Sequence, residues 1–333
     1  MRQRASRPSQ SGRFLSVRFV ILTLIGFLVA GGAGAGAYFL PALAAARQIT
    51  DVGSPNLGSV TQPSAPAIDV SGNLQPFTVL LLGSDNDAKF DPNQLLTQSM
   101  ILVRVEPATH KVAMFSIARD LYVPIPQNGT AKIDKAYAFG GAKLAMATVQ
   151  QNFQVRIDNY VWIGLEGLVK LIDMVGGIDV VTSNPVLDDY YPDDIHSSDP
   201  YGYTRVAVLP GAQHLDGIHA MQYVRSRHSD LRGDFGRSVR QQQVLLALRT
   251  KAKSLTAADI PDLASTFNGQ LKTDLSLDRI RALLPVAAKV QTQDVKQMTL
   301  LNYTVGENIG GEDVLLPSDW AAIHSLVHQD FPS

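Results

Sequence analysis

Short apolar runs that alternate with helical patterns after residue 77 constrain the fold more than any other feature of the sequence. Three runs have the length and composition of β-strands: FTVLLLG (77–83), SMILVRV (99–105) and KVAMFSI (111–117). They are followed by helical patterns at 141–153 and 165–175 and by the strand-like segments NYVWIGL (159–165) and GIDVVTS (177–183). Several of the runs are apolar on both faces, as strands covered by helices on both sides are. We therefore predict an α/β fold, an α/β/α sandwich with a mixed central sheet.

The N-terminal segment predicts a membrane anchor. Arginines recur through residues 1–18, residues 19–40 carry no charge, and the first acidic residue is Asp51. Such a run would span roughly 30 Å as a helix, and the basic residues before it favour a cytoplasmic leader. A cleaved signal peptide is the alternative, because small residues follow in PALAAARQ, but its apolar region would be only about 7–15 residues long.

These patterns divide the chain into a cytoplasmic leader (1–18), a transmembrane anchor (19–40), an extracytoplasmic linker (41–76) and a folded domain (77–333). The linker is rich in Pro, Gly and Ser and has no apolar period, which is typical of an extended stalk. We therefore expect a single-pass protein of the cell membrane with its folded domain outside the cytoplasm.

Composition excludes several classes of site. The chain has no cysteine, so it forms neither a disulfide nor a thiolate metal site or nucleophile. The net charge is −1, which lacks the global basic excess of a nucleic-acid-binding protein. Any anion site must therefore be local.

A local cationic cluster occurs in YVRSRHSDLRGDFGRSVRQQQ, residues 223–243. It contains five arginines and two aspartates and no lysine: Arg225, Arg227, Arg232, Arg237, Arg240, Asp230 and Asp234. One interpretation is a network of Arg–Asp ion pairs that joins two helices. The excess of planar, permanently charged guanidinium groups favours an anion with several oxygens, such as a pyrophosphate.

Two helices are predicted around this cluster, at 217–227 and 235–252, the first capped by Asp216. On the second, Arg237, Arg240 and Gln241 fall at i, i+3 and i+4 and share one face. Asp234 lies at the start of that helix, where a carboxylate is favoured by the helix dipole.

The acidic segment between the predicted strands and these helices, residues 184–203, contains VLDDYYPDDIHSSDPYGY. Its spacing fits no calcium-binding loop, so we expect a solvated loop.

Ordered sequence blocks make the chain resemble the LytR-CpsA-Psr family of bacterial cell-wall assembly. The blocks are LLLGSD (80–85), SIARDLYVPIP (116–126), KIDKAYAFGG (132–141), DNYVWIGLEGL (158–168), GGIDV (176–180), LDGIHAMQYVRSRH (215–228) and DFGRSVRQQQVL (234–245). The resemblance implies an α/β/α domain that holds a polyprenyl-pyrophosphate-linked glycan with its lipid in an apolar pocket. It also implies transfer of the glycosyl phosphate to a sugar hydroxyl of peptidoglycan.

The resemblance also assigns roles to residues of this chain. It implies a pyrophosphate site lined by Arg119, Arg225, Arg227, Arg237, Arg240 and Gln241, with Arg119 also catalytic. Asp85 would hold Mg²⁺. Asp234 would accept or orient the proton of the acceptor hydroxyl, or would only position Arg225 or Arg237.

The chain departs from the family pattern near the expected metal. Leu96 and Gln98 stand where the family has an arginine and an aspartate, Asp87 replaces an arginine, and Ala118 replaces a proline. A glutamine carbonyl can still coordinate, so we expect Mg²⁺ to be held by Asp85 and Gln98 mainly together with the substrate. The lost carboxylate leaves two alternatives to transfer: a noncatalytic binder, or a hydrolase, of polyprenyl-pyrophosphate-linked glycans.

Overall fold

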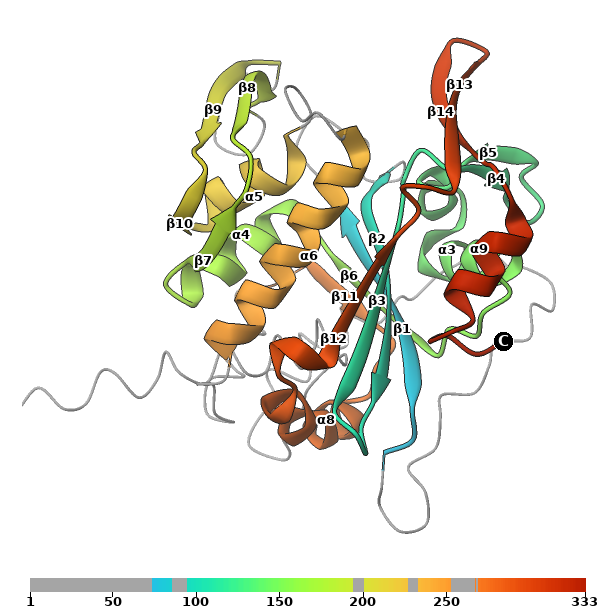
Figure 1. Cartoon of the computed structure of the whole chain (residues 1–333), viewed down its shortest axis with the longest axis horizontal. Helices are drawn as coiled ribbons and strands as arrows, with labels where there is room; N and C mark the ends of the chain where they lie inside the picture. Colours follow the sequence, from blue (N-terminus) through green and yellow to red (C-terminus); the bar gives the residue numbers. More distant parts are fainter. Residues whose placement is uncertain (1–73, 86–94, 194–200, 227–232, 253–266, 268) are drawn as a thin grey trace, which may run out of the picture.

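The computed structural model describes residues 74–85, 95–193, 201–226, 233–252, 267 and 269–333 (Figure 1). The predicted leader and anchor, and most of the linker, lie outside these residues. Within them, no helix is both long enough and apolar enough to cross a bilayer.

A six-stranded mixed sheet forms the centre of the fold, in the order β11-β6-β1-β2-β3-β12. Its strands are β1 (Phe77–Ser84), β2 (Thr97–Glu106), β3 (Lys111–Ile117), β6 (Asn159–Ile163), β11 (Leu271–Thr273) and β12 (Val295–Thr299). Strand β2 is antiparallel to both β1 and β3, whereas β6 joins β1 and β12 joins β3 in parallel. The prediction of a mixed sheet built on three early apolar strands is confirmed.

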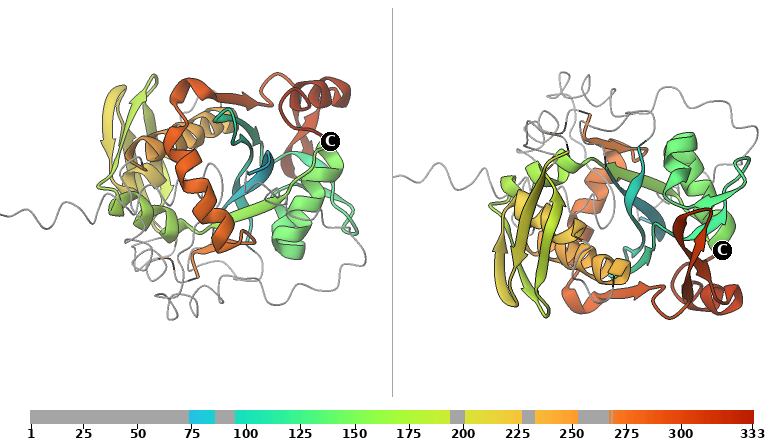
Figure 2. Two further views of the ribbon diagram at one scale, coloured as in Figure 1. Left: turned by 90° about the horizontal axis from the view of Figure 1, so that it is seen from below. Right: turned by 90° about the horizontal axis from the view of Figure 1, so that it is seen from above.

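Both faces of this sheet are covered by helices, as Figure 2 shows. Alternate residues of β1 enter opposite cores, since Val79 and Leu81 belong to one apolar cluster and Leu80 and Leu82 to the other. The first core lies under α4 (Leu165–Met174), α5 (Gly217–Arg225), α6 (Gly233–Ala252) and α8 (Leu277–Lys289), and the second under α3 (Lys135–Phe153) and α9 (Trp320–Val327). Burial on both faces explains why the strands are apolar at successive positions.

One predicted helix differs from the observed one in its bounds, and the predicted cap of another is present. Helix α3 begins at Lys135, before the predicted 141–153, and bends at Gly140 and Gly141. Gly141 has φ 65°, a left-handed conformation that favours glycine over other residues. The predicted cap of α5 is confirmed, because the side chain of Asp216 accepts a hydrogen bond from the backbone N–H of His219.

The expectation of a solvated loop at 184–203 is wrong for residues 186–192. They form strand β8 (Val186–Pro192), which pairs antiparallel with β9 (Tyr203–Val208), a strand that begins at the last residue of the segment. Val186 and Val206 are buried in the first core, and even Asp188 is only 2% exposed. The register of the β8–β9 pair shifts between Asp188 and Tyr191, which breaks the alternation of apolar and polar residues that is typical of a strand. Because the segment is also rich in acidic residues, its sequence did not indicate a strand.

Three further two-stranded units lie at the edges of the sandwich: β7 (Ile178–Thr182) with β10 (Gly211–Leu215), β4 (Tyr122–Pro124) with β5 (Thr130–Lys132), and β13 (Thr304–Ile309) with β14 (Glu312–Pro317). The last hairpin projects from the molecule beside β4 and β5 (Figure 1). Its tight turn contains Gly310 and Gly311, with φ of 61° and 87°, which is the backbone that a type I′ turn requires.

Candidate functional site

The order of β1, β2 and β3 brings three separate segments of sequence to one edge of the sheet. Because β2 is antiparallel to both neighbours, its first residues lie beside the last residues of β1 and β3. Asp85 follows β1, Gln98 lies at the start of β2, and Arg119 comes shortly after β3. The fold therefore gathers the expected metal ligands and the expected catalytic arginine.

These three side chains form a continuous hydrogen-bonded chain. The Gln98 Nε2 donates to Asp85 Oδ2 at 3.0 Å, and Arg119 donates to the Gln98 Oε1. The second Asp85 oxygen, Oδ1, accepts from the backbone N–H of Leu96 at 2.9 Å. Asp85 is 2% exposed, and burial raises the pKa of its carboxyl group although these two donors act in the opposite direction.

As these side chains lie, they do not fit a divalent cation. Mg²⁺ binds oxygen ligands, yet Gln98 presents its NH₂ group to Asp85 and directs its oxygen to Arg119. Turning the amide over would place its NH₂ group against the guanidinium of Arg119, which has no acceptor. No group of three His, Cys, Asp or Glu side chains that could hold a metal occurs in the described part of the chain.

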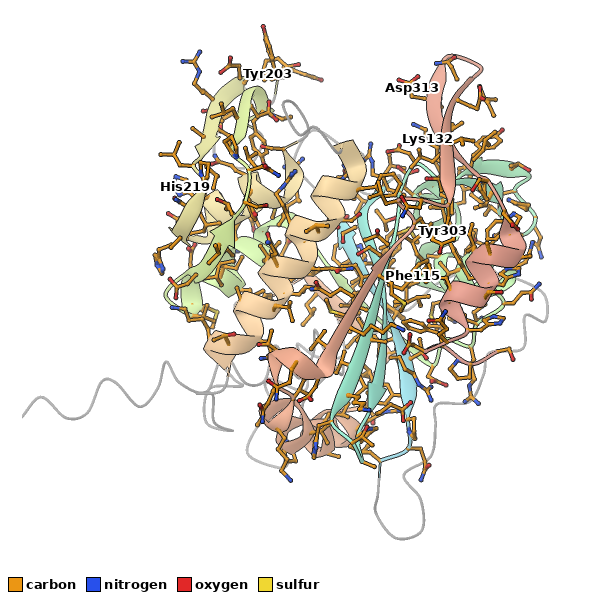
Figure 3. The ribbon with its side chains drawn as sticks, viewed as in Figure 1. Phe115, Lys132, Tyr203, His219, Tyr303 and Asp313 are labelled. Atoms are coloured by element: carbon orange, nitrogen blue, oxygen red, sulfur yellow. The ribbon has the colours of Figure 1, made fainter. Side chains whose placement is uncertain are left out.

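Arg119 lies among three charged neighbours. Its Nε is 3.3 Å from Asp120 Oδ2, and Asp120 Oδ1 also pairs with Lys132 Nζ at 3.0 Å. A nitrogen of Arg119 is 4.0 Å from Asp134 Oδ2. Burial raises the pKa of Asp134 to about 6, against the opposing pull of Arg119. Figure 3 shows Lys132 at the base of the β13–β14 hairpin.

An apolar cavity of about 90 Å³ lies beside this chain, between β1, β2 and β6 of the sheet and helices α4 to α6. Its walls include Leu81, Ile101, Leu165 and Val244. The polar side chains that line it are Ser84, Gln98, Ser99, Arg225 and Gln241. An apolar chamber with a few polar groups at one part of its wall suits an amphiphile whose polar end carries charge.

Arg225 and Gln241 reach the cavity from α5 and α6. The Arg225 guanidinium lies 5.6 Å from the centre of the Tyr191 ring and donates to the Tyr191 Oη at 3.3 Å. Gln241 accepts a hydrogen bond from the Ser99 Oγ at 2.9 Å. Two residues expected at the pyrophosphate, Arg225 and Gln241, thus line one cavity, while their role in binding stays a prediction.

Arg240 lies away from the cavity, which differs from the expectation that it contacts the pyrophosphate. It is 5% exposed and donates to the backbone carbonyls of Tyr223 at 2.6 Å and of Ser226. Its guanidinium also lies 5.6 Å from the centre of the Tyr223 ring. Burial lowers the pKa of Arg240 to about 10. This geometry favours a positioning role, because the side chain fixes the end of α5, which carries Arg225.

The remaining predicted residues are only partly described. Arg237 is 4% exposed on α6, one turn before Gln241. The side chain of Asp234 and the whole of Arg227 lie outside the described residues, so their predicted roles stay predictions.

Comparison with known proteins identifies the family. The model of the LytR_cpsA_psr family matches residues 53–322. The chain belongs to this family. The match begins before β1 and includes α8 and the β13–β14 hairpin, so it extends well beyond the sequence blocks that suggested the resemblance.

Two LytR-CpsA-Psr relatives carry the same name, polyisoprenyl-teichoic acid–peptidoglycan teichoic acid transferase TagU. The protein of Enterococcus faecalis is 36% identical over 213 residues, which are 63% of this chain and 65% of that relative. The protein of Bacillus cereus is 30% identical over 266 residues, 79% of this chain and 81% of the relative. The chain thus spans just under two thirds of the length of the first and about four fifths of the second.

Solved LytR-CpsA-Psr structures share the fold. The crystal structure of TagV from Bacillus subtilis is 26% identical and superposes with a TM-score of 0.62, covering 77% of this chain and 97% of that one. The mixed sheet between two helical layers is therefore the architecture of the family.

Sequence reasoning missed three LytR-CpsA-Psr site residues of this chain. Ser99 orients Gln241, Tyr191 supports Arg225, and Ser84 lines the cavity with a buried hydroxyl that has no hydrogen-bond partner among the described residues. The signal for the serines was available, because both lie next to residues already singled out, Asp85 and Gln98. Tyr191 could not be found, since the hairpin that carries it was interpreted as a loop.

Proposed function

We propose that this protein transfers a glycosyl phosphate from a polyprenyl-pyrophosphate-linked glycopolymer to a sugar hydroxyl of peptidoglycan. The single observation that carries the proposal is an apolar cavity whose polar lining adjoins a partly buried arginine. Gln98 lines that cavity and accepts a hydrogen bond from Arg119. The names of the relatives support the same reaction, since both are transferases of a polyisoprenyl-linked polymer to peptidoglycan.

The cavity suits the part of the donor lipid next to the pyrophosphate, because about 90 Å³ is too small for a whole polyprenyl chain. Its walls are apolar, so a polyprenyl chain would gain roughly 0.8 kcal/mol for each CH₂ group removed from water. Arg225 lines the same cavity and lies against Tyr191, and its guanidinium would contact the phosphate attached to the lipid.

The reaction exchanges one P–O bond for another. The acceptor hydroxyl oxygen attacks the phosphorus attached to the sugar, the bond from that phosphorus to the bridging oxygen breaks, and polyprenyl phosphate leaves with the bond electrons. The hydroxyl proton passes to a base, for which Asp234 remains the prediction from sequence. Arg119 and Arg225 would offset charge on the transferring and leaving oxygens. No step is assigned to Mg²⁺, because Gln98 directs its NH₂ group to Asp85.

We propose that the reaction takes place outside the cytoplasm on a membrane-anchored chain. The support is the uncharged run at residues 19–40 behind an arginine-rich leader. An anchor would hold the cavity near the bilayer that contains the lipid substrate.

Reconstitution tests the proposal. The full chain in detergent micelles is incubated with a synthetic polyprenyl-pyrophosphate oligosaccharide and soluble peptidoglycan oligomers, and the products are identified by mass spectrometry. Transfer yields a phosphodiester conjugate and an equal amount of polyprenyl phosphate. A free sugar phosphate without conjugate would identify a hydrolase, and bound but unchanged lipid would identify a noncatalytic binder.

A matched variant tests the role given to Arg225. Arg225→Lys keeps the charge but loses the planar fork, so we expect donor affinity to fall by about tenfold. Arg104→Lys, on the side of β2 away from the cavity, serves as the control.

A further inference from the structure

A second hollow has Arg119 in its lining, which the apolar cavity does not. It has a volume of about 870 Å³ and runs between the β13–β14 hairpin and the segment of β4 and β5. Its lining includes Arg119, Asp120 and Lys132 on the body of the protein and Glu307, Asn308 and Glu312 on the hairpin. We call this hollow the hairpin groove. Among the residues that the structure describes, it shares no lining residue with the apolar cavity.

One hydrogen bond connects the two hollows. Arg119 lines the hairpin groove and donates to Gln98, which lines the apolar cavity. A phosphoryl group held beside these two side chains would therefore face the cavity on one side and the groove on the other. Phosphoryl transfer needs this arrangement, because the attacking and leaving oxygens lie roughly in line through the phosphorus.

The wall of the groove is fixed to the body of the protein. The backbone N–H of Leu315 donates to the Asp120 carbonyl at 2.9 Å, and Leu121 pairs with Leu315 in a parallel bridge. Nearer the turn, Lys135 Nζ lies 2.8 Å from Glu312 Oε1. These two attachments, at Leu315 and at Glu312, fix the hairpin to the body of the protein before any ligand binds, which lowers the entropy cost of binding.

The charge of the groove selects against a polyanion. Among the described residues, four carboxylates line it, those of Asp120, Glu307, Glu312 and Asp313, against the two cations Arg119 and Lys132. Lys135 lies outside the lining and pairs with Glu312, so the excess of negative charge is one. A phosphate-rich glycopolymer would be repelled by this excess. Sugar hydroxyls and amide groups would find many acceptors, and an ammonium group on a peptide stem would be attracted.

We propose that the hairpin groove binds the acceptor, a peptidoglycan glycan strand, and directs its hydroxyl to the phosphoryl group beside Arg119. This inference rests on the proposed function, since it assigns the second substrate of that reaction. The glycan enters along β13 and β14, whereas the lipid of the donor occupies the apolar cavity. Figure 3 labels two residues that line the groove, Lys132 near the base of the hairpin and Asp313 higher on it.

Binding of the acceptor alone tests the inference separately from the reaction. Soluble, uncross-linked peptidoglycan glycan oligomers are titrated into the full chain in detergent without donor, with calorimetric detection. The test variants are Glu307→Ala and the double variant Glu307→Ala/Asp313→Ala, which leave the attachments of Leu315 and Lys135 in place. Glu106→Ala, at the opposite end of β2 from Gln98, is the matched control.

We expect the double variant to weaken oligomer binding by about tenfold and to raise the acceptor KM with little change in kcat, whereas Glu106→Ala binds as the wild type does. Unchanged oligomer binding in the double variant would overturn the inference. A loss of affinity for the polyprenyl-pyrophosphate donor would also overturn it, because the groove would then hold the donor glycan. If oligomer binding depended on Glu307 and Asp313 but no glycosyl phosphate were transferred, the groove would remain the acceptor-binding site and the proposed reaction would be rejected.

Discussion

At the scale of single residues, the orientation of the Gln98 amide determines whether the site beside Asp85 suits a metal ion. Its amide is the one group in the buried chain from Asp85 to Arg119 that both donates and accepts, so its orientation is fixed by a carboxylate on one side and a guanidinium on the other. A carboxylate at this position could not donate to Asp85. The glutamine therefore links two opposite charges directly, where two carboxylates would need a cation between them.

Gln98→Asp should create affinity for Mg²⁺. The variant places two carboxylates side by side, and their repulsion favours a divalent cation with oxygen ligands. We expect the free variant to bind Mg²⁺ at least about tenfold more tightly than the free wild type does, as measured by calorimetric titration without substrate. Equal affinity in the two proteins would contradict this account of the site.

Asp134→Asn should stabilise the protein at neutral pH. The pKa of Asp134 is raised by burial from 3.8 to about 6, so its favourable contribution is complete below about pH 4 and is lost as the pH rises through 6. The shift corresponds to a cost of about 3 kcal/mol above pH 6. Urea unfolding should show that the free energy of unfolding of the variant, relative to that of the wild type, is larger at pH 7.5 than at pH 5. A constant difference between the two would show that Asp134 does not titrate in this range.

At the scale of elements, the junction of α5 and α6 depends on Arg240. Its side chain joins the two helices through the carbonyls of Tyr223 and Ser226 and so determines where Arg225 lies. Arg225 is in turn supported from a third element, the β8–β9 hairpin, by Tyr191. A substitution at Arg240 should therefore act on stability first and on substrate binding through Arg225.

Arg240→Lys should reduce the free energy of unfolding by about 2–3 kcal/mol, because a lysine cannot serve both carbonyls with a planar fork. Denaturant unfolding measures the change in the free energy of unfolding. The control is Arg104→Lys, which alters an ion pair near the end of strand β2. If the variant kept wild-type stability but lost donor binding, Arg240 would be a direct ligand, as the family resemblance implied.

Elements with an uninterrupted pattern were predictable from sequence, and elements with a broken one were not. The apolar runs of β1 to β3 and the helical faces of α4 to α6 follow from period and length alone. The β8–β9 hairpin was missed because its register irregularity and its buried Asp188 disguise the alternation. The contact between Arg119 and Gln98 needed the strand order, and that order follows from tertiary pairing. The hairpin groove was not predicted at all, because its two walls are separated by about 180 residues of sequence.

At the scale of the whole molecule, the anchor predicted at residues 19–40 would confine the catalytic domain to the membrane surface. Protease added to intact, wall-stripped cells should then remove the folded domain, since the proposed topology would leave only the first 18 residues inside. Immunoblotting with an antibody to the domain measures the loss. A domain that survives until the cells are lysed would reverse the topology.

The apolar cavity and the hairpin groove have no lining residue in common among the described residues, and this separation affects the kinetics of a two-substrate reaction. Neither substrate has to pass through the site of the other, so the two can bind in either order before the phosphoryl group moves. Double-reciprocal plots at several fixed donor concentrations should therefore intersect, as in a sequential mechanism in which both substrates are bound before transfer. Parallel lines would indicate that the enzyme itself carries the glycosyl phosphate between two half-reactions.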